Sequence, residues 1–252
     1  MRIDPFELLL ASHFPILDSP DDLPHVPGLL QDAGPSGQPS EFCASLRTDP
    51  EMVGKAAASG YIPMGLEVGS RSALLVKLNT QRCILEFSHL HVGKSTRRRA
   101  RGLHIVTDCD AARCLEAIVD YHPERWLIEP LCRSLLSRHR TPRYGVAVPW
   151  VEIYRGARLV AGEIGYTCGA VYTSLSGFHR ESGAGSVQLA CLGRALADRG
   201  FAFWDLGMEV DYKLRLGAHL VSRDQFLTRF RRRSETPELR LDHDCAAIVG
   251  QR

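Results

Sequence analysis

A glycine-rich turn between a predicted strand and a predicted helix contains the first residues whose spacing could bind a ligand. It reads Arg180-Glu181-Ser182-Gly183-Ala184-Gly185. Glycines at 183 and 185 would let backbone amides approach a phosphate closely, and the N-terminus of the following helix favours negative charge. Arg180, Gly183 and Gly185 are therefore candidate ligands for a pyrophosphate, although an ordinary strand-to-helix turn could use the same residues.

A carboxylate lies at the end of the next apolar strand. Asp205 is expected at the edge of the sheet, where loops converge and where site residues are common. It could deprotonate an attacking amine, or hold a cationic substrate by a charge-assisted hydrogen bond. An aspartate that bonds the backbone of the following turn is the structural alternative. The glycine-rich turn and Asp205 together suggest acyl transfer from an adenosine-containing carrier, either coenzyme A or tRNA.

Cationic residues cluster in two segments of the chain. The first segment contains Lys94, Arg97, Arg98, Arg99 and Arg101. The second segment contains Arg229, Arg231, Arg232 and Arg233. Each alone is consistent with a solvated surface, but together they could form a stripe that binds phosphates. An RNA backbone is the expected ligand of such a stripe.

Composition places the chain among ordinary globular proteins. Its 252 residues, 44% of them apolar and 24% charged, can bury a sizeable core. No apolar run could cross a bilayer, and the Leu8-Leu9-Leu10 cluster is too short for a signal peptide, so we expect a cytoplasmic protein without a membrane partner. The eight cysteines lack a C-x-x-C pair, which predicts reduced thiols and no metal site.

The predicted elements define an α+β protein. Strands are expected at Ala73–Leu78, Cys83–Phe87, Leu103–Thr107 and Phe201–Leu206, with an antiparallel meander over Val146–Phe178. A helix over Ala111–Tyr121, capped by Asp110, would bury Ala112, Leu115 and Val119. These elements predict four segments along the chain. They are an irregular arm at 1–45, a small α+β domain at 46–140, a mixed sheet with flanking helices at 141–235 and a tail at 236–252.

Capping residues predict the ends of three further helices. Asp49 precedes a short helix that has proline at its first position. Ser186 and Gly200 bracket the helix that follows the glycine-rich turn. Ser222 and Gln225 form a capping box for a last helix, whose apolar residues are expected to face inward.

Several motifs together resemble the leucyl/phenylalanyl-tRNA–protein transferases, which move an amino acid from aminoacyl-tRNA to a protein N-terminus. The resemblance runs from about Pro50 to Arg231. It rests, in order, on Gly60-Tyr61-Ile62-Pro63, Arg82-Cys83-Ile84-Leu85, Leu90-His91-Val92, Ser95, Trp126, Glu152-Ile153-Tyr154, Leu159-Val160-Ala161-Gly162, Asp205 and Leu216-Gly217-Ala218. The family's fold is similar to that of the GCN5-related N-acetyltransferases, whose R-x-x-G-x-G pattern the glycine-rich turn also fits. Residues 141–235 would therefore be an acetyltransferase-like domain.

The resemblance implies roles for particular residues. Asp205 would help the acceptor amine attack the ester, and Trp126 would border the terminal adenosine of a tRNA held by the first basic segment. An apolar pocket with Tyr172, Leu175 and Phe178 would take a leucine, phenylalanine or methionine side chain. The partners would be aminoacyl-tRNA and an acceptor protein or peptide N-terminus, as in N-degron protein degradation. No cofactor or metal is implied, and a monomer is expected.

Three positions depart from the family's pattern. Gly207 stands where the family has glutamine, Leu175 where it has glutamate, and Met64 where it has tryptophan. Glu163 or Glu209 could compensate for the missing acid. Two alternatives therefore remain open: an acyl-CoA-dependent N-acetyltransferase that uses the glycine-rich turn, and a non-catalytic tRNA-binding relative.

Overall fold

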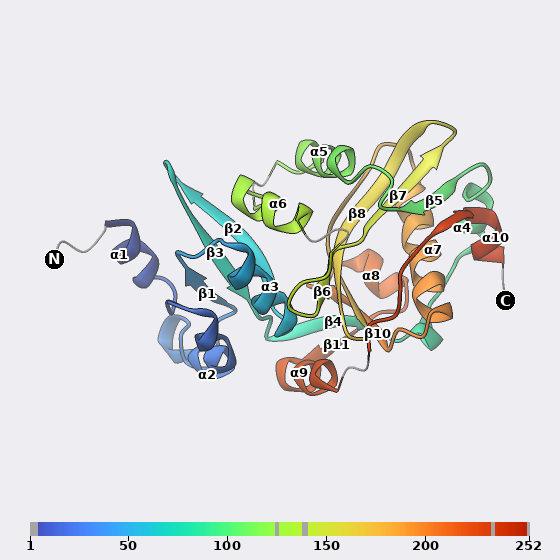
Figure 1. Cartoon of the computed structure of the whole chain (residues 1–252). Coiled ribbons are helices and arrows are strands. Elements are labelled where there is room, and N and C mark those ends of the chain that lie inside the picture. Colours follow the sequence, from blue (N-terminus) through green and yellow to red (C-terminus); the bar gives the residue numbers. More distant parts are fainter. Residues whose placement is uncertain (1–4, 124–125, 138–140, 233–234, 251–252) are drawn as a thin grey trace. The chain divides into compact units, whose positions relative to one another are not determined.

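The computed structural model describes residues 5–123, 126–137, 141–232 and 235–250. The chain divides into two compact units (Figure 1). Unit 1 comprises residues 1–80 together with 124–137, and unit 2 comprises 81–123 together with 138–252. These units differ from the four expected segments, because the chain leaves unit 2 after residue 123 and returns to it after residue 137.

Unit 1 packs short helices against a three-stranded antiparallel sheet of order β1-β3-β2. Its elements are α1 (Pro5–Ala11), η1 (Pro20–His25), α2 (Val26–Leu29), η2 (Pro35–Gly37), β1 (Phe42–Ser45), α3 (Pro50–Ala58), β2 (Ile62–Val68), β3 (Arg71–Lys77) and α6 (Glu129–Leu136). The described part of segment 1–45 is thus folded, since Leu10, Leu17 and Leu23 are buried and Tyr61 donates a hydrogen bond to the Leu23 carbonyl at 2.9 Å.

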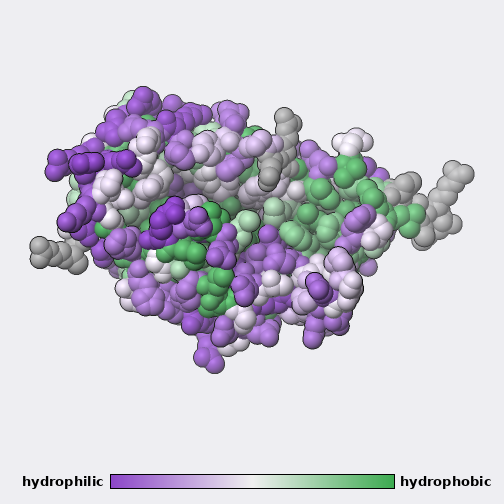
Figure 2. Space-filling model, turned by 180° about the vertical axis from the view of Figure 1, so that it is seen from behind, coloured by the Kyte–Doolittle hydropathy of each residue, from purple (hydrophilic) through white to green (hydrophobic). Residues whose placement is uncertain are grey.

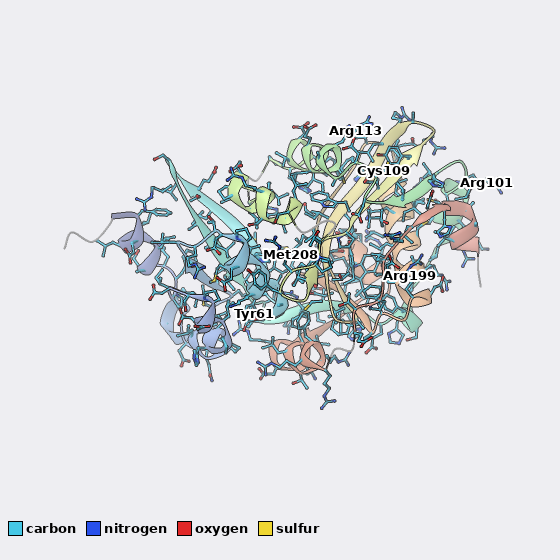
Figure 3. All side chains as sticks on the ribbon, in the orientation of Figure 1. Tyr61, Arg101, Cys109, Arg113, Arg199 and Met208 are labelled. Carbon is cyan, nitrogen blue, oxygen red and sulfur yellow. The ribbon has the colours of Figure 1, made fainter. Side chains whose placement is uncertain are left out.

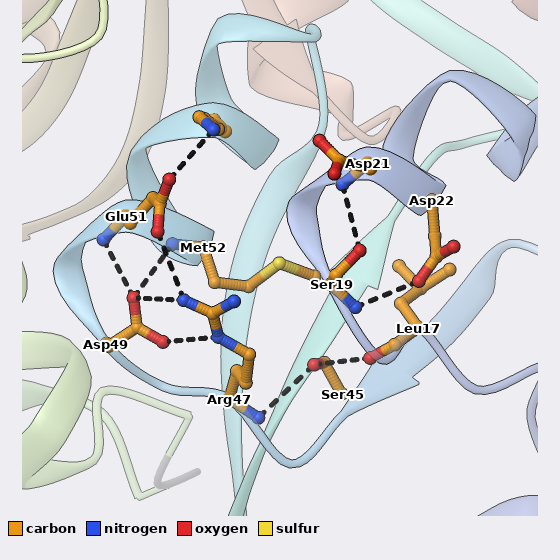
Figure 4. Close-up of polar contacts among 10 residues, drawn as sticks. Leu17, Ser19, Asp21, Asp22, Ser45, Arg47, Asp49, Glu51 and Met52 are labelled. Carbon is orange, nitrogen blue, oxygen red and sulfur yellow. Dashed lines mark hydrogen bonds and ion pairs between the residues drawn. The ribbon is translucent and has the colours of Figure 1, made fainter.

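A polar network fixes this segment beside α3 (Figure 4). Asp49 caps α3 by accepting from the backbone amides of Glu51 and Met52, and it also pairs with Arg47 at 2.8 Å. The Ser45 hydroxyl donates to the Leu17 carbonyl at 2.7 Å. The N-terminal segment therefore contributes to the core of unit 1, and the irregular arm expected there is replaced by short helices and a strand.

Unit 2 contains one large mixed sheet of order β11-β4-β10-β9-β8-β7-β5-β12, with β6 beside β8. Its strands are β4 (Gln81–Leu85), β5 (His104–Thr107), β6 (Val146–Ala147), β7 (Trp150–Arg155), β8 (Arg158–Cys168), β9 (Val171–His179), β10 (Phe203–Gly207), β11 (His219–Ser222) and β12 (Asp242–Asp244). Its helices are η3 (Phe87–His89), α4 (Lys94–Arg99), α5 (Ala111–Tyr121), α7 (Ala184–Asp198), α8 (Asp211–Arg215), α9 (Arg223–Arg231) and α10 (Cys245–Gly250). The acetyltransferase-like order expected from the sequence is present: an antiparallel meander leads through a turn and α7 to β10, which pairs in parallel with β9.

Successive residues of β8 face opposite sides of the sheet. Glu163 contacts Gln188 of α7, whereas a side chain at Gly162 would meet Cys114 of α5 at 2.8 Å. Helices α7 and α5 therefore cover opposite faces of β8 and β9. The apolar residues of α7 pack with those of β7, β8 and β10 into the main core of unit 2.

Three helix predictions hold and two need correction. Asp49 caps α3, as predicted. Asp110 caps α5 and the Ser222–Gln225 capping box begins α9, both as predicted. Helix α7 begins after Gly183, whose φ of +84° supplies the left-handed residue of the turn, so Ser186 lies inside the first turn and is not the cap. In α5 the buried stripe is shifted from the expected one, because Ala112 and Val119 are exposed, whereas Ile118 is buried along with Leu115.

The C-terminal segment also belongs to the core of unit 2. Strand β12 pairs with β5, and α10 buries Cys245, Ile248 and Val249. The segment expected to be a tail thus closes the edge of the large sheet. In the part of the chain that the structure describes, no helix combines the length and the apolar character needed to cross a membrane.

Candidate active site

The parallel strands β9 and β10 separate at the candidate acid. Their pairing begins at Phe203 and ends with Asp205 opposite Thr173. Strand β9 then continues to His179 beside β8, while β10 continues to Gly207 beside β4. The carboxyl ends of adjacent strands that part in this way are a common place for ligands in α/β sheets.

Asp205 is fully buried and holds four hydrogen bonds. Arg82 donates through Nε to Oδ1 at 2.7 Å and through Nη2 to Oδ2 at 2.8 Å. The Thr173 hydroxyl and the Gly207 amide each donate at 3.0 Å. The Arg82 guanidinium also lies over the Phe226 ring at 4.6 Å. Because a carboxylate has about four acceptor sites, these contacts leave Asp205 as a positioning residue in this geometry, and its role as an acid or base stays a prediction.

The backbone after Asp205 requires glycine. Gly207 has a φ of +74°, in the left-handed region that residues with a side chain adopt rarely. Buried Lys213 donates through Nζ to the carbonyls of Leu206 at 2.6 Å and Met208 at 2.9 Å. Burial lowers the pKa of Lys213. The glutamine of the family's pattern is thus replaced here by a tight turn that a lysine holds from inside.

A second buried carboxylate, Glu163, lies on the α7 face of the sheet. Tyr172 and Ser174 each donate a hydroxyl hydrogen bond to Oε1 at 2.8 Å, and the Gln188 side-chain amide donates to Oε2. Trp204 Nε1 in turn donates to the Ser174 hydroxyl at 2.9 Å. The sequence contained one signal of this cluster, a glutamate within a strand that is otherwise apolar and small, but it did not show which face Glu163 occupies.

Burial raises the pKa of Glu163, against the opposing effect of its three hydrogen bonds. Since the pKa of this carboxyl is raised on folding, its contribution to stability is full below about pH 4.5 and is lost as pH rises through the folded pKa. We therefore expect the free energy of unfolding of the wild type, relative to that of Glu163→Gln, to decrease as pH rises above about 4.5. Urea unfolding at several pH values measures this relative stability, with the exposed Glu116→Gln variant as control. A wild type that gains stability over Glu163→Gln as pH rises would contradict the assignment.

The residues expected to form one aminoacyl pocket lie at different places. Tyr172 is fully buried in the core beneath α7. Phe178 lies beside Cys114 on the α5 face, with the Arg180 guanidinium 5.5 Å from its ring. Leu175 is half-exposed and occupies a β-bulge, where the register of β9 against β8 shifts. The structure therefore does not bring Tyr172, Leu175 and Phe178 onto one face.

The basic helix and the glycine-rich turn form one surface of unit 2. Lys94, Arg97, Arg98, Arg99 and Arg101 are all exposed. The side chain of Arg99 lies against Gly183, where an added Cβ would be 2.5 Å from Arg99 Cδ. The end of unit 2 that carries α4 and α10 is strongly hydrophilic (Figure 2), and Arg101 lies at this end, whereas Arg113 lies on α5 (Figure 3). The two motifs that suggested different phosphate ligands are thus neighbours.

The turn also carries an anion. Glu181 pairs with Arg155 at 2.6 Å and with Arg158 at 3.1 Å, and the hydrogen bond from Arg155 lowers the pKa of Glu181. The Arg99 side chain covers Gly183, so a pyrophosphate could approach the turn amides only if this side chain moved, and the Glu181 carboxylate already engages Arg155 and Arg158. The geometry therefore disfavours the coenzyme A alternative based on Arg180, Gly183 and Gly185.

The other cationic residues expected to bind tRNA lie elsewhere. Helix α9 packs against β4 and β11, whereas α4 packs against α7 and α10, so the two basic segments do not form one stripe. Arg229 pairs with Glu86 at 2.6 Å, and Arg233 lies outside the described residues. Trp126 belongs to unit 1, where it is half-buried and its carbonyl accepts from Gly65 at 2.8 Å.

One group of side chains in unit 2 has the composition of a metal site. Ligand atoms of Glu86, His89 and His219 lie within 4.8 Å of one another. The two imidazole rings have centroids 6.2 Å apart. Glu86 is already engaged by Arg229, so an ion there would compete with an existing ion pair. Neither the candidate acid nor the Glu163 cluster includes these residues.

Comparisons with known proteins identify the family of the chain. Residues 84–231 match the profile of a family described as leucyl/phenylalanyl-tRNA protein transferase. The chain belongs to this family. A leucyl/phenylalanyl-tRNA–protein transferase of Rubrobacter xylanophilus is 32% identical over 200 residues, which cover 78% of this chain and 98% of the relative. The leucyl/phenylalanyl-tRNA–protein transferase of Roseobacter denitrificans is 28% identical over 76% of this chain and 90% of its own length. That of Maridesulfovibrio salexigens is 30% identical over 76% of this chain and 80% of its own length.

The part of the chain that matches the leucyl/phenylalanyl-tRNA protein transferase profile extends from β4 to α9. It therefore includes both buried carboxylates, Asp205 and Glu163, and the basic helix α4. The matched part also includes Gly217, in the loop that lies against the backbone of His89 in η3.

Proposed function

We propose that this chain is an aminoacyl-tRNA-dependent protein transferase, which moves an amino acid from charged tRNA to the N-terminal amine of a protein. The observation that carries the proposal is membership in the family, through a match that spans the divergence of β9 and β10 and the exposed helix α4. We place this activity in the cytoplasm and in a monomer, and we assign it to N-degron protein degradation.

The proposed reaction exchanges one acyl bond for another. The acceptor ammonium loses a proton, and its nitrogen attacks the carbonyl carbon of the aminoacyl ester. A C–N bond forms, the C–O bond to the ribose breaks, and the ribose oxygen gains a proton. Because the ester is already activated, positioning of the two macromolecules supplies most of the acceleration.

The contacts of the described residues suggest how the chain would position its substrates. Asp205, through Arg82, Thr173 and Gly207, would hold the end of β10 in place while the amine approaches. Helix α4 would bind tRNA phosphates with its exposed arginines. Trp126 would border the terminal adenosine, as the resemblance to the family implies.

A transfer assay tests the proposal directly. Pure protein is incubated with charged tRNA and a peptide whose first residue is arginine or lysine, and mass spectrometry follows the peptide. We expect a mass increase of one amino acid residue that RNase abolishes. Acetyl-CoA serves in a parallel reaction. Acetylation would favour the coenzyme A alternative, and tRNA binding without any transfer would favour a non-catalytic relative.

Replacement of Arg97 and Arg98 by glutamine is expected to weaken tRNA binding at every salt concentration. Each lost phosphate contact reduces the slope of log K against log salt by roughly one, so the double variant should lose about two. Filter binding between about 50 and 200 mM salt measures the slope. Arg113→Gln, which removes an exposed arginine from α5, is the matched control. Equal slopes for all three proteins would show that α4 does not contact the RNA.

A further inference from the structure

Three side chains with metal-binding atoms meet where the edge strand β11 begins. Glu86 is the N-cap residue of η3, His89 is the last residue of η3, and His219 is the first residue of β11. One ligand atom of each residue lies within 4.8 Å of the other two. Within the described ranges of the chain, no other three histidine, cysteine, aspartate or glutamate side chains form such a group.

The backbone holds these three residues together. Glu86 and His89 have the i, i+3 spacing of a 3₁₀ turn, which places their side chains on the same side of η3. His219 pairs with Ile84 at the end of β4. Gly217 lies so close to η3 that a Cβ there would be 2.0 Å from the His89 carbonyl oxygen. Backbone contacts that need no ion therefore keep the two imidazoles near each other.

The side chains have lone pairs to offer an ion. His89 Nδ1 lies 3.8 Å from Glu86 Oε2, and the two imidazole centroids are 6.2 Å apart. Apart from these contacts, no hydrogen bond from a described residue engages either ring. Arg229 donates to Oε1 of Glu86 at 2.6 Å, so Oε2, on the side of His89, can bind an ion. Neutral imidazoles and carboxylate oxygens are common ligands of divalent transition metals.

The distances and the ligand types suit zinc. Zinc–nitrogen and zinc–oxygen bonds of about 2.0–2.2 Å place neighbouring ligand atoms of a tetrahedron roughly 3.3 Å apart. The three ligand atoms must close to this separation from at most 4.8 Å, and rotation of the His89 side chain, which is 57% exposed, permits the closure. Magnesium and calcium prefer sites built of oxygen ligands. Two imidazoles and one carboxylate therefore favour zinc, with water as its fourth ligand.

We propose that Glu86, His89 and His219 bind one zinc ion, which fastens β11 to η3. Strand β11 is at the edge of the large sheet and has β4 as its one neighbour there, so a metal link to η3 restrains it from the other side. Arg229 has two effects: its hydrogen bond orients the Glu86 carboxylate, and its charge opposes that of the ion. The sequence predicted no metal site from the spacing of cysteines, and none of these ligands is a cysteine.

Calorimetry of the full chain tests the site. The protein is dialysed against a chelator and titrated with zinc chloride, and with magnesium chloride as the comparison. We expect one zinc ion per chain, no magnesium binding, and a melting temperature that rises with zinc concentration because the ion binds the folded state. Hydrogen exchange of the β11 amides should slow when zinc is added. Absence of zinc binding would overturn the site, and unchanged exchange in the zinc-bound protein would overturn the restraint of β11.

Variants assign the ion to these ligands. His89→Asn and His219→Asn should each weaken zinc binding by at least about tenfold. His243→Asn, an exposed position on β12, is the control and should keep the wild-type affinity. Arg229→Gln removes the competing cation and should tighten binding by about tenfold, the equivalent of one hydrogen bond to a charged group. Thermal melting without metal confirms that each variant is folded.

Two outcomes would overturn the assignment. The first is wild-type zinc affinity in folded His89→Asn and His219→Asn proteins. The second is a thiolate charge-transfer band when cobalt replaces zinc, because such a band would place the ion at a cysteine. Transfer activity is not used in any of these measurements, so failure of the proposed transferase function would leave their result unchanged.

Discussion

Replacing Asp205 by alanine is expected to lower the free energy of unfolding by about 3–5 kcal/mol. The change removes one partner of a fully buried ion pair and leaves the Arg82 guanidinium charged in the interior, beneath the Phe226 ring. Urea unfolding of the full chain measures the effect. Thr173→Val is the matched comparison, because it removes one hydroxyl donor from the same carboxylate and should cost about 1 kcal/mol.

A double variant distinguishes the loss of the Arg82–Asp205 ion pair from the loss of a direct role of Asp205 in transfer. Replacing both partners by apolar residues, Arg82→Met with Asp205→Leu, should recover most of the stability, since no uncompensated charge remains. If Asp205→Ala alone were as stable as the wild type, the ion pair would not support the fold. Transfer activity lost in Asp205→Ala would then indicate direct chemistry; otherwise the loss follows from displacement of β10.

Replacing Gly217 by alanine is expected to cost about 2–5 kcal/mol. A Cβ at this position would be 2.0 Å from the carbonyl oxygen of His89, and the φ of +106° is unfavourable for any side chain. Overpacking and backbone strain each contribute about 1–3 kcal/mol. The turn after β4 would have to move away from the segment before β11, and the hydrogen bond from the His91 amide to the Leu216 carbonyl, 2.8 Å long, would break.

Chemical unfolding measures the loss of stability in Gly217→Ala, and hydrogen exchange of the His91 amide measures the loss of its hydrogen bond to Leu216. Gly93→Ala is the control in the same unit, because no atom lies within 4 Å of its Cβ position and its φ is −69°. We expect that change to cost less than about 1 kcal/mol, since Gly93 is only a helix N-cap without a side-chain contact. An alanine at 217 that left both the stability and the exchange unchanged would show that the approach of the two loops is loose.

Local signals predicted much of the fold. Capping residues such as Asp110 and Ser222 act within one turn of their helix, so the sequence alone identifies the ends of α5 and α9. Residues 1–45 and 236–252 were misjudged for a different reason. Their short apolar pieces become buried only through distant partners, as when β12 pairs with β5, and no local pattern encodes such pairing.

The candidate site was predictable only in part. Asp205 was identified from its place at the end of an apolar strand, but its partner Arg82 comes from a strand more than a hundred residues away. The bulge at Leu175 shifts the register of β9, so residues chosen by sequence spacing, Tyr172 and Phe178, do not share a face. Glu163 accepts a hydrogen bond from Gln188 of α7, and only the fold brings these two side chains together.

The pairing of β12 with β5 has a consequence for how the protein is made. His104 and Asp242, whose side chains form a hydrogen bond across this strand pair, are separated by 138 residues. At translation rates of roughly 5–20 residues per second, the ribosome needs on the order of ten seconds to synthesise the second partner after the first. During that interval β5 has one open edge and the apolar side of α7 lacks α10. The nascent chain is thus most exposed to mispairing late in synthesis, and chaperone contact should be concentrated there.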